Sequence, residues 1–175
     1  MSEPGARRGG LLGPVVVAVA AAVLVAVLGG LATDTGTWYE ALRKPSWQPP
    51  AWAFGPAWTL IFALIAAAGT IAWRSAPDVP TRHWLISLFA INGVLNVAWS
   101  VIFFSLKRPD WALVEVALLW LSILILIVFI VRFSPRAALL LVPYLAWVTF
   151  AGVLNFAVTQ LNAPFPRASL LHALI

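Results

Sequence analysis

Residues 11–32 read LLGPVVVAVAAAVLVAVLGGLA, a stretch of apolar residues that contains no charged side chain. A helix that crosses the hydrocarbon core of a bilayer needs about 20 residues of this kind. Four further apolar stretches follow, so we expect transmembrane helices over about residues 11–33, 52–73, 83–106, 111–131 and 137–161. The sequence therefore predicts an all-α membrane protein, a bundle of five transmembrane helices.

The composition agrees with this fold class. Hydrophobic residues make up 62% of the 175 residues and charged residues 10%, whereas an average soluble domain is about 25% charged. The five helices would occupy nearly the whole chain, so we expect one membrane domain over residues 11–161. Residues 1–10 and 162–175 would form an N-terminal and a C-terminal tail.

The basic residues are distributed as membrane anchors. The formal net charge is +5, and most Lys and Arg residues stand near the ends of apolar stretches, as in Arg7/Arg8, Arg43/Lys44 and Lys107/Arg108. Such positions place the charges at the lipid headgroups. A nucleic-acid surface would instead gather them on one polar face, so we expect no nucleic-acid partner.

The sequence lacks the residue pattern of a metal site or a reactive thiol. The chain contains no cysteine, and His83 and His172 form no metal-ligand spacing with each other or with a carboxylate. Zinc sites in proteins need several Cys, His or carboxylate ligands at close spacing. We therefore expect no metal site and no bound cofactor.

The first apolar stretch has two interpretations. Arg7 and Arg8 precede it as in a signal peptide, and Gly30-Leu31-Ala32 resembles a cleavage site with small residues. However, the stretch is longer than the apolar part of a usual signal peptide, which favours a retained helix. Small residues recur every four positions and predict a face for close helix packing: Ala18, Ala22, Ala26 and Gly30.

Residues 34–51 form the longest predicted connection. Pro45, Pro49 and Pro50 restrict its backbone, and Trp38 and Trp47 supply large amphipathic rings. A restrained, aromatic connection of this kind could act as a lid over the end of the bundle.

Polar residues inside the predicted helices indicate where a site could lie. Asn92, Asn96 and Ser100 are spaced four residues apart, so they share one face of a helix, with Trp99 beside them. Similar inward faces carry Trp58 and Phe62, and Trp147, Ala151 and Asn155. One interpretation is an apolar pocket for a flat hydrophobic ligand, stacked on indoles and oriented by amides. The alternative is that the asparagines join helices and the tryptophans belong to the interfacial belts.

Two residues break the apolar pattern. Glu115 is the one acidic residue expected well inside a helix, and we expect it to reach the interface or to pair with Lys107 or Arg108. Pro143 falls inside the fifth predicted helix and should bend it.

Several motifs, in order, resemble those of one membrane protein family. They are WYEALRKPSWQPP at residues 38–50, FGPAWT at 54–59, the stretch from Asn92 to Phe104, and PYLAW at 143–147 with Leu154-Asn155. This pattern is similar to the TspO/MBR family, the tryptophan-rich sensory proteins, over about residues 33–162.

The resemblance implies a five-helix bundle, commonly a homodimer, that binds porphyrins in a pocket beneath the first connection. By motif position, the ligand-binding residues would be Tyr39, Trp58, Asn92, Asn96, Trp99, Trp147 and Ala151. The resemblance also implies a multi-pass protein of a bacterial cell membrane. Its tetrapyrrole ligand would be transported or sensed or, in a second interpretation, degraded under light, with Trp58 and Trp147 as the catalytic residues. A third interpretation is a structural or regulatory membrane protein.

One departure concerns sterols. The cholesterol-recognition pattern of mammalian relatives continues after the Leu-Asn pair with a tyrosine and a basic residue, whereas here Leu154-Asn155 is followed by FAVTQ at residues 156–160. Because this motif is weak evidence even when intact, we expect no cholesterol binding.

Overall fold

The structure is a computed structural model, and it describes residues 12–165. The predicted N-terminal tail and most of the predicted C-terminal tail lie outside this range. The helices are α1 (Leu12–Ala32), α2 (Thr37–Ala41), the 3-10 turn η1 (Ala51–Ala53), α3 (Phe54–Ser75), α4 (Val79–Ser100), the π-helical turn η2 (Val101–Ser105), α5 (Pro109–Val131), α6 (Pro135–Leu140) and α7 (Val142–Asn162).

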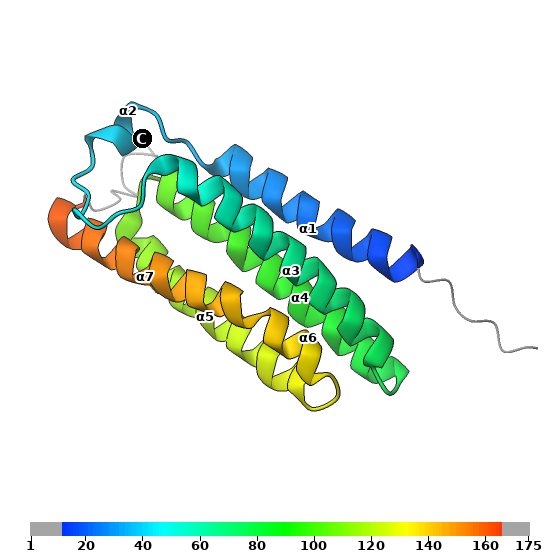
Figure 1. Ribbon diagram of the computed structural model, residues 1–175. Coiled ribbons are helices and arrows are strands. Elements are labelled where there is room, and N and C mark those ends of the chain that lie inside the picture. The colour runs from blue at the N-terminus through cyan, green and yellow to red at the C-terminus, as the bar shows by residue number, and fades with distance from the viewer. Residues whose placement is uncertain (1–11, 166–175) are drawn as a thin grey trace, which may run out of the picture.

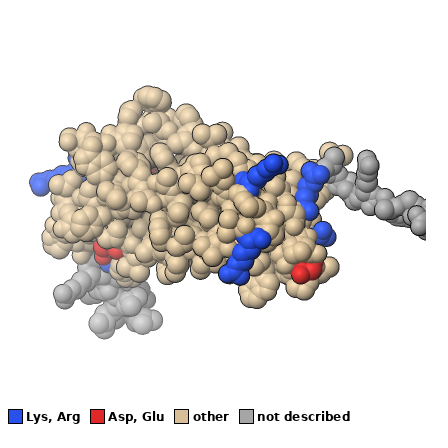
Figure 2. All heavy atoms as spheres, turned by 60° about the horizontal axis from the view of Figure 1, so that its bottom comes forward, with Lys and Arg blue, Asp and Glu red and all other residues tan. Residues whose placement is uncertain are grey.

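Five helical segments are long and apolar enough to cross a membrane. They are Leu12–Ala32, Ala51–Ser75, Val79–Ser105, Pro109–Val131 and Pro135–Asn162. This confirms the predicted all-helical bundle of five spans, and the chain is a multi-pass integral membrane protein. Figure 2 shows a broad uncharged zone across the middle of one face, with Lys and Arg side chains toward its two ends.

Helix α1 lies at the edge of the bundle, where it packs against α3 and α4 (Figure 1). Gly29 is its one buried residue. The connection that follows α1 carries α2 across the end of the bundle at which α7 finishes (Figure 1). This end therefore has a cover made from residues 33–50.

The two ends of the bundle are packed differently. At the end away from α2, small and aliphatic side chains fill the core, including Ala68, Ala72, Leu126 and Ile130. At the α2 end the core is aromatic, with Phe103 and Phe104 against Leu154. Tyr39 and Trp99, two of the predicted ligand-binding residues, pack against this aromatic core, so the site is expected at this end.

Two helix boundaries differ from the sequence-based expectation. Helix α4 begins at Val79 rather than at His83, because the Asp78 carboxylate caps it by accepting a hydrogen bond from Thr81 N at 2.7 Å. The fifth span is interrupted at Leu141, two residues before Pro143, so that α6 and α7 are separate helices. Leu141 N donates to Ala138 O at 3.1 Å, a tighter turn of the kind that accommodates a proline.

Candidate ligand-binding site

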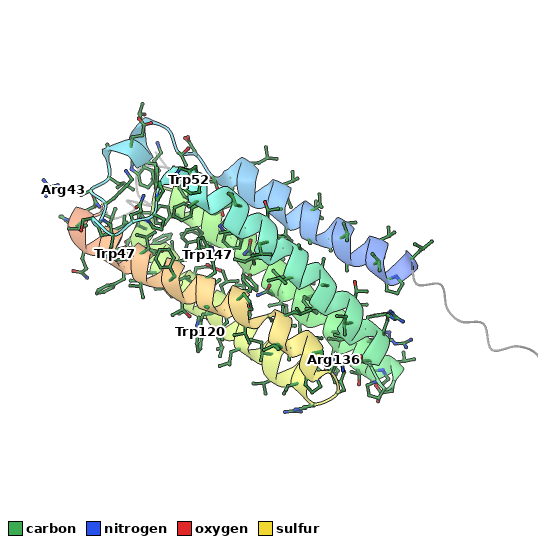
Figure 3. The ribbon with its side chains drawn as sticks, in the orientation of Figure 1. Arg43, Trp47, Trp52, Trp120, Arg136 and Trp147 are labelled. Carbon is green, nitrogen blue, oxygen red and sulfur yellow. The ribbon has the colours of Figure 1, made fainter. Side chains whose placement is uncertain are left out.

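A cavity of about 1320 Å³ lies under the connection that carries α2. Its wall is built by that connection together with α1, α3, α4, α5, η2 and α7. Pockets for small molecules and cofactors are usually about 300–1,000 Å³, so this cavity has room for a large ligand. Figure 3 shows Trp147 on the side of α7 that faces α3, beneath the connection.

The structure brings six of the seven predicted ligand-binding residues to the wall of this cavity: Tyr39, Trp58, Asn96, Trp99, Trp147 and Ala151. The seventh, Asn92, is buried at 4% exposure and does not line the cavity. Ligand binding by any of these residues stays a prediction. The six residues come from four segments of the chain, and all of them could contact a ligand in the same cavity.

Trp58 is the centre of the first aromatic group. Its ring stacks on Phe62, with 5.4 Å between centroids and 28° between planes, and meets Trp147 at 6.3 Å and 82°. Trp147 also contacts Phe54 at 5.8 Å. Edge-to-face and offset contacts of this kind hold the rings in fixed orientations. The two indoles thus form adjoining walls of the cavity at nearly a right angle.

Trp99 belongs to a second aromatic group. It lies 5.2 Å from Phe103 and 6.0 Å from Phe104, and Phe104 in turn contacts Tyr39 at 5.4 Å. The helix widens to a π-turn here, because Leu106 N donates to Val101 O, five residues earlier, at 2.9 Å. The apolar spacing of this segment did not predict a π-turn.

A buried hydrogen-bond network stands behind the wall. Tyr144 Oη accepts from Asn96 Nδ2 at 3.1 Å and donates to Asn92 Oδ1 at 3.3 Å. Asn92 Nδ2 donates to Ser122 Oγ at 2.8 Å. Asn92 therefore joins α4 to α5 and α7, which is the helix-joining interpretation of that residue.

Asn155 fixes the orientation of Trp99. Its Oδ1 accepts from Trp99 Nε1 at 3.2 Å, while its Nδ2 donates to Pro109 O at 2.8 Å. Asn155 itself is 2% exposed. Because both ends of the amide are engaged, Asn155 positions an indole and leaves no free amide donor for a ligand.

Several polar groups on the wall have no hydrogen-bond partner among residues 12–165, and they include Asn96 Oδ1, Trp58 Nε1 and Trp147 Nε1. None of them is a fully buried atom, so each is open to the cavity or to the surface. Two indole donors and one amide acceptor within an apolar cavity could orient a flat ring system that carries its own nitrogen or carbonyl groups.

The rim of the cavity includes residues that the sequence pattern did not single out. Lys44 Nζ donates to Tyr39 O at 2.6 Å and to Glu40 O and Leu42 O, both at 3.2 Å, and lies 4.5 Å from the Tyr39 ring centroid. Lys44 thus holds the last turn of α2 together. Burial raises the pKa of the Tyr39 phenol, and the hydrogen bond from Gln48 partly opposes this shift. The position of Lys44 just after a short helix was the feature of the sequence that could have predicted its bonds to the last carbonyl groups of α2.

Glu115 does not have the partner expected from the sequence. Arg108 pairs instead with Asp110, its Nε lying 2.8 Å from Asp110 Oδ1. Glu115 is 6% exposed, and neither of its carboxyl oxygens has a hydrogen-bond partner among the described residues. The expectation of a pair with Lys107 or Arg108, or of reaching the interface, was wrong, because Arg108 pairs with Asp110 and Lys107 is exposed whereas Glu115 is buried.

Comparison with known proteins assigns the chain to a family. Residues 17–161 match the TspO/MBR family. The chain belongs to the TspO/MBR family. It is 42% identical to the tryptophan-rich protein TspO of Chlorobaculum tepidum over 125 residues, which are 71% of this chain and 79% of that protein. It is also 42% identical to the tryptophan-rich protein TspO of Archaeoglobus fulgidus over 132 residues, 75% of this chain and 84% of that protein. The translocator protein of Homo sapiens is 35% identical over 126 residues, 71% of this chain and 75% of that protein. The resemblance found in the motifs is therefore confirmed for this TspO/MBR protein.

Proposed function

We propose that this TspO/MBR protein is a membrane receptor or carrier for tetrapyrroles of the protoporphyrin type, with a transport or stress-regulatory role in porphyrin metabolism. The observation that carries the proposal is the cavity of about 1320 Å³ in which Trp58 and Trp147 form adjoining walls. A tetrapyrrole is flat, largely apolar and rich in nitrogen, so indole faces can stack on it and the free polar groups can orient it.

The family supports the same ligand class. The resemblance of the motifs implies porphyrin binding beneath the first connection, and the cavity lies beneath residues 33–50. The relatives include a tryptophan-rich sensory protein of Cereibacter sphaeroides and the translocator protein of Homo sapiens. Sensing and translocation are both roles in which a ligand is bound and released unchanged.

Tryptophan fluorescence tests the proposal directly. Protoporphyrin is titrated in the dark into purified protein in nanodiscs, with empty nanodiscs and an unrelated membrane protein of similar tryptophan content as controls. We expect saturable quenching by the protein and an unchanged porphyrin absorption spectrum. Quenching no greater than in the unrelated protein would reject a tetrapyrrole site and favour a structural or regulatory role.

Light-dependent breakdown of porphyrin is the second candidate function. The specific observation in its favour is that two electron-rich indoles, Trp58 and Trp147, adjoin each other at 6.3 Å on the wall of the cavity. Illumination of the same samples distinguishes the two functions. A loss of porphyrin absorbance that needs the protein and both tryptophans would support an enzyme, whereas a stable spectrum supports a receptor or carrier.

We also expect a homodimer, as the family resemblance implies. Helix α1 exposes a row of large apolar side chains, including Val16, Leu24 and Val27, which lipid or a second subunit would cover. Native mass spectrometry of the protein released from nanodiscs would give the oligomeric state directly, and a monomer at all protein concentrations would contradict the expectation.

A further inference from the structure

The cavity extends well beyond the aromatic chamber. It continues along the seam between α1 and α3, where its wall includes Val19, Ala22 and Ala26 from α1 and Thr59, Ala63 and Ala67 from α3. Val15 and Gly30 mark its ends on α1, a separation of about 22 Å along a helix that rises 1.5 Å per residue. This part, which we call the α1–α3 groove, therefore spans most of the depth of the hydrocarbon core.

The groove is open toward the membrane. Val19, Ala63 and Ala67 line it and are at the same time exposed on the surface of the protein. A residue that is exposed and also lines the cavity marks a place where the cavity has no outer wall. Ala63 and Ala67 are small, so a larger side chain at either position would project into the groove.

The seam between α1 and α4 is packed at two glycines. Along α4, a Cβ atom added to Gly93 would come within 3.0 Å of Val25 Cγ2, and one added to Gly29 would lie 3.8 Å from Ser100 Oγ. The Val25 side chain therefore packs directly on the backbone of Gly93 and fills the seam at that point. The α4 residues that line the cavity, Asn96, Trp99 and Ser100, are not exposed, so the opening lies on the α3 side of α1.

The aqueous end of the chamber is also covered. Asn162 bonds Arg43 through both its amide groups, at 2.9 and 2.8 Å. Trp47 packs on Phe150 at 6.0 Å, and Lys44 holds the turn at the end of α2. These contacts place an ordered cover, residues 33–50, between the chamber and water.

The groove suits an apolar molecule in transit. Its two threonine hydroxyls, on Thr59 and Thr70, already donate to Gly55 O at 2.9 Å and to Ala66 O at 2.8 Å in their own helix. The remaining groove residues named above are Ala, Val and Gly. A flat apolar ring would meet no unpaired donor on its way to Trp58, which stands where the groove joins the chamber.

We propose that the tetrapyrrole enters and leaves the chamber sideways from the bilayer, through the α1–α3 groove, while the cover over the chamber stays in place. This inference depends on the proposed function, because it gives the route by which the same ligand reaches the same chamber. It makes the α1–α3 groove a membrane-facing passage for flat apolar ligands that partition into lipid.

A filled groove tests the passage. The variant Ala63→Phe/Ala67→Phe places two rings in the groove, and Leu60→Phe is the matched control, since Leu60 is 60% exposed and does not line the cavity. Protoporphyrin is mixed with each protein in nanodiscs by stopped flow, and the rate and final extent of Trp quenching are recorded. Asn162→Ala, which loosens the cover, is measured in parallel.

We expect the filled groove to slow association and dissociation by a common factor of about tenfold, since a raised barrier changes both rates and leaves their ratio unchanged. Leu60→Phe and Asn162→Ala should bind at the wild-type rate. Because the chain has no cysteine, Ala63→Cys coupled to N-cyclohexylmaleimide in detergent provides a second plug that should give the same result.

Three results would overturn the passage. Unchanged rates with both plugs would show that the groove is not the route, and faster binding by Asn162→Ala alone would place the route under the cover. A weaker affinity with unchanged association would make the groove part of the binding site. Absence of quenching in the wild type is a separate outcome, seen before any variant is compared, and it rejects the proposed function and the passage together.

Discussion

Asn162, in the last turn of α7, holds the backbone of Arg43 from both sides: Arg43 N donates to Asn162 Oδ1 at 2.9 Å, and Asn162 Nδ2 donates to Arg43 O at 2.8 Å. The two residues are 119 positions apart in the chain. This pair ties the cover, residues 33–50, to the helix that carries Trp147 and Ala151 (Figures 1 and 3).

Asn162→Ala should release the cover without unfolding the bundle. Both hydrogen bonds to Arg43 are lost, and because the pair is exposed we expect about 1 kcal/mol or less of local stability to go with them. Tryptic cleavage after Arg43, followed by mass spectrometry, should become several times faster. Gln160→Ala is the control, since Gln160 is an exposed residue two positions earlier. Equal cleavage rates in the two variants would contradict a latch.

Trp58→Phe and Trp147→Phe should each weaken protoporphyrin binding. A phenyl ring stacks less strongly than an indole and has no N–H, so a loss of about 1 kcal/mol, or about fivefold in affinity, is expected for each. Trp120→Phe is the matched control, because Trp120 Nε1 donates to Thr149 Oγ1 at 2.8 Å and the residue does not line the cavity. An equal loss in the control would assign the quenching to nonspecific binding at the lipid surface.

Alanine variants of Asn92 and Asn96 should differ in their effects on stability and on protoporphyrin affinity. Asn92→Ala removes the donor to Ser122 Oγ and the acceptor of the Tyr144 hydroxyl proton behind the wall, so thermal unfolding should show a loss of about 1–2 kcal/mol with little change in protoporphyrin affinity. Asn96→Ala removes an acceptor that faces the cavity and should lower the affinity as well. Fluorescence titration at a temperature where both variants are folded checks the difference. A larger loss of affinity in Asn92→Ala would place the ligand against Asn92 instead.

The sequence predicted the five spans well, because each is a long apolar stretch bounded by charges or prolines. It also identified the faces that converge on the cavity, because the spacing of Asn96 and Trp99, and of Trp147 and Ala151, follows the helical repeat. It did not distinguish Asn92 from Asn96, since both residues share one helix face and their separation depends on where Tyr144 lies in three dimensions.

The features that the sequence did not predict depend on local or long-range hydrogen bonds. The π-turn at Val101–Ser105 shifts a backbone bond by one residue and leaves no mark on the apolar pattern. The Asn162 latch joins residues 119 positions apart. Glu115 was expected to pair because basic residues stand nearby in the sequence. The sequence positions of the charges do not show that Arg108 pairs with Asp110 instead.

Tyr39 should make the cover sensitive to high pH. Burial raises the pKa of its phenol above the ordinary value of 10.0. The folded cover therefore holds the proton more tightly than the unfolded chain, so its stability is constant below about pH 10 and falls as the pH rises through the range between the two pKa values. Tryptic cleavage after Arg43 is measured against pH up to the limit of the protease, with hydrogen exchange beyond it. Tyr39→Phe should lose this dependence; a variant with the same pH profile as the wild type would exclude Tyr39 as its source.

Glu115→Leu should stabilise the bundle. Both carboxyl oxygens are buried without a hydrogen-bond partner among the described residues, an arrangement that costs about 1–3 kcal/mol. A leucine of similar size would lie on the same face of α5 as Ala112 and Leu119, which are both buried. Thermal unfolding in detergent measures the change, and Glu115→Gln is the control, because its amide is equally unpartnered and should leave the unfolding temperature nearly unchanged. A clear loss of stability in Glu115→Leu, with Glu115→Gln unaffected, would contradict this prediction and show that the polar group at position 115 makes a hydrogen bond. Its partner would then be sought among ligands of the cavity, which the neighbouring Val116 lines.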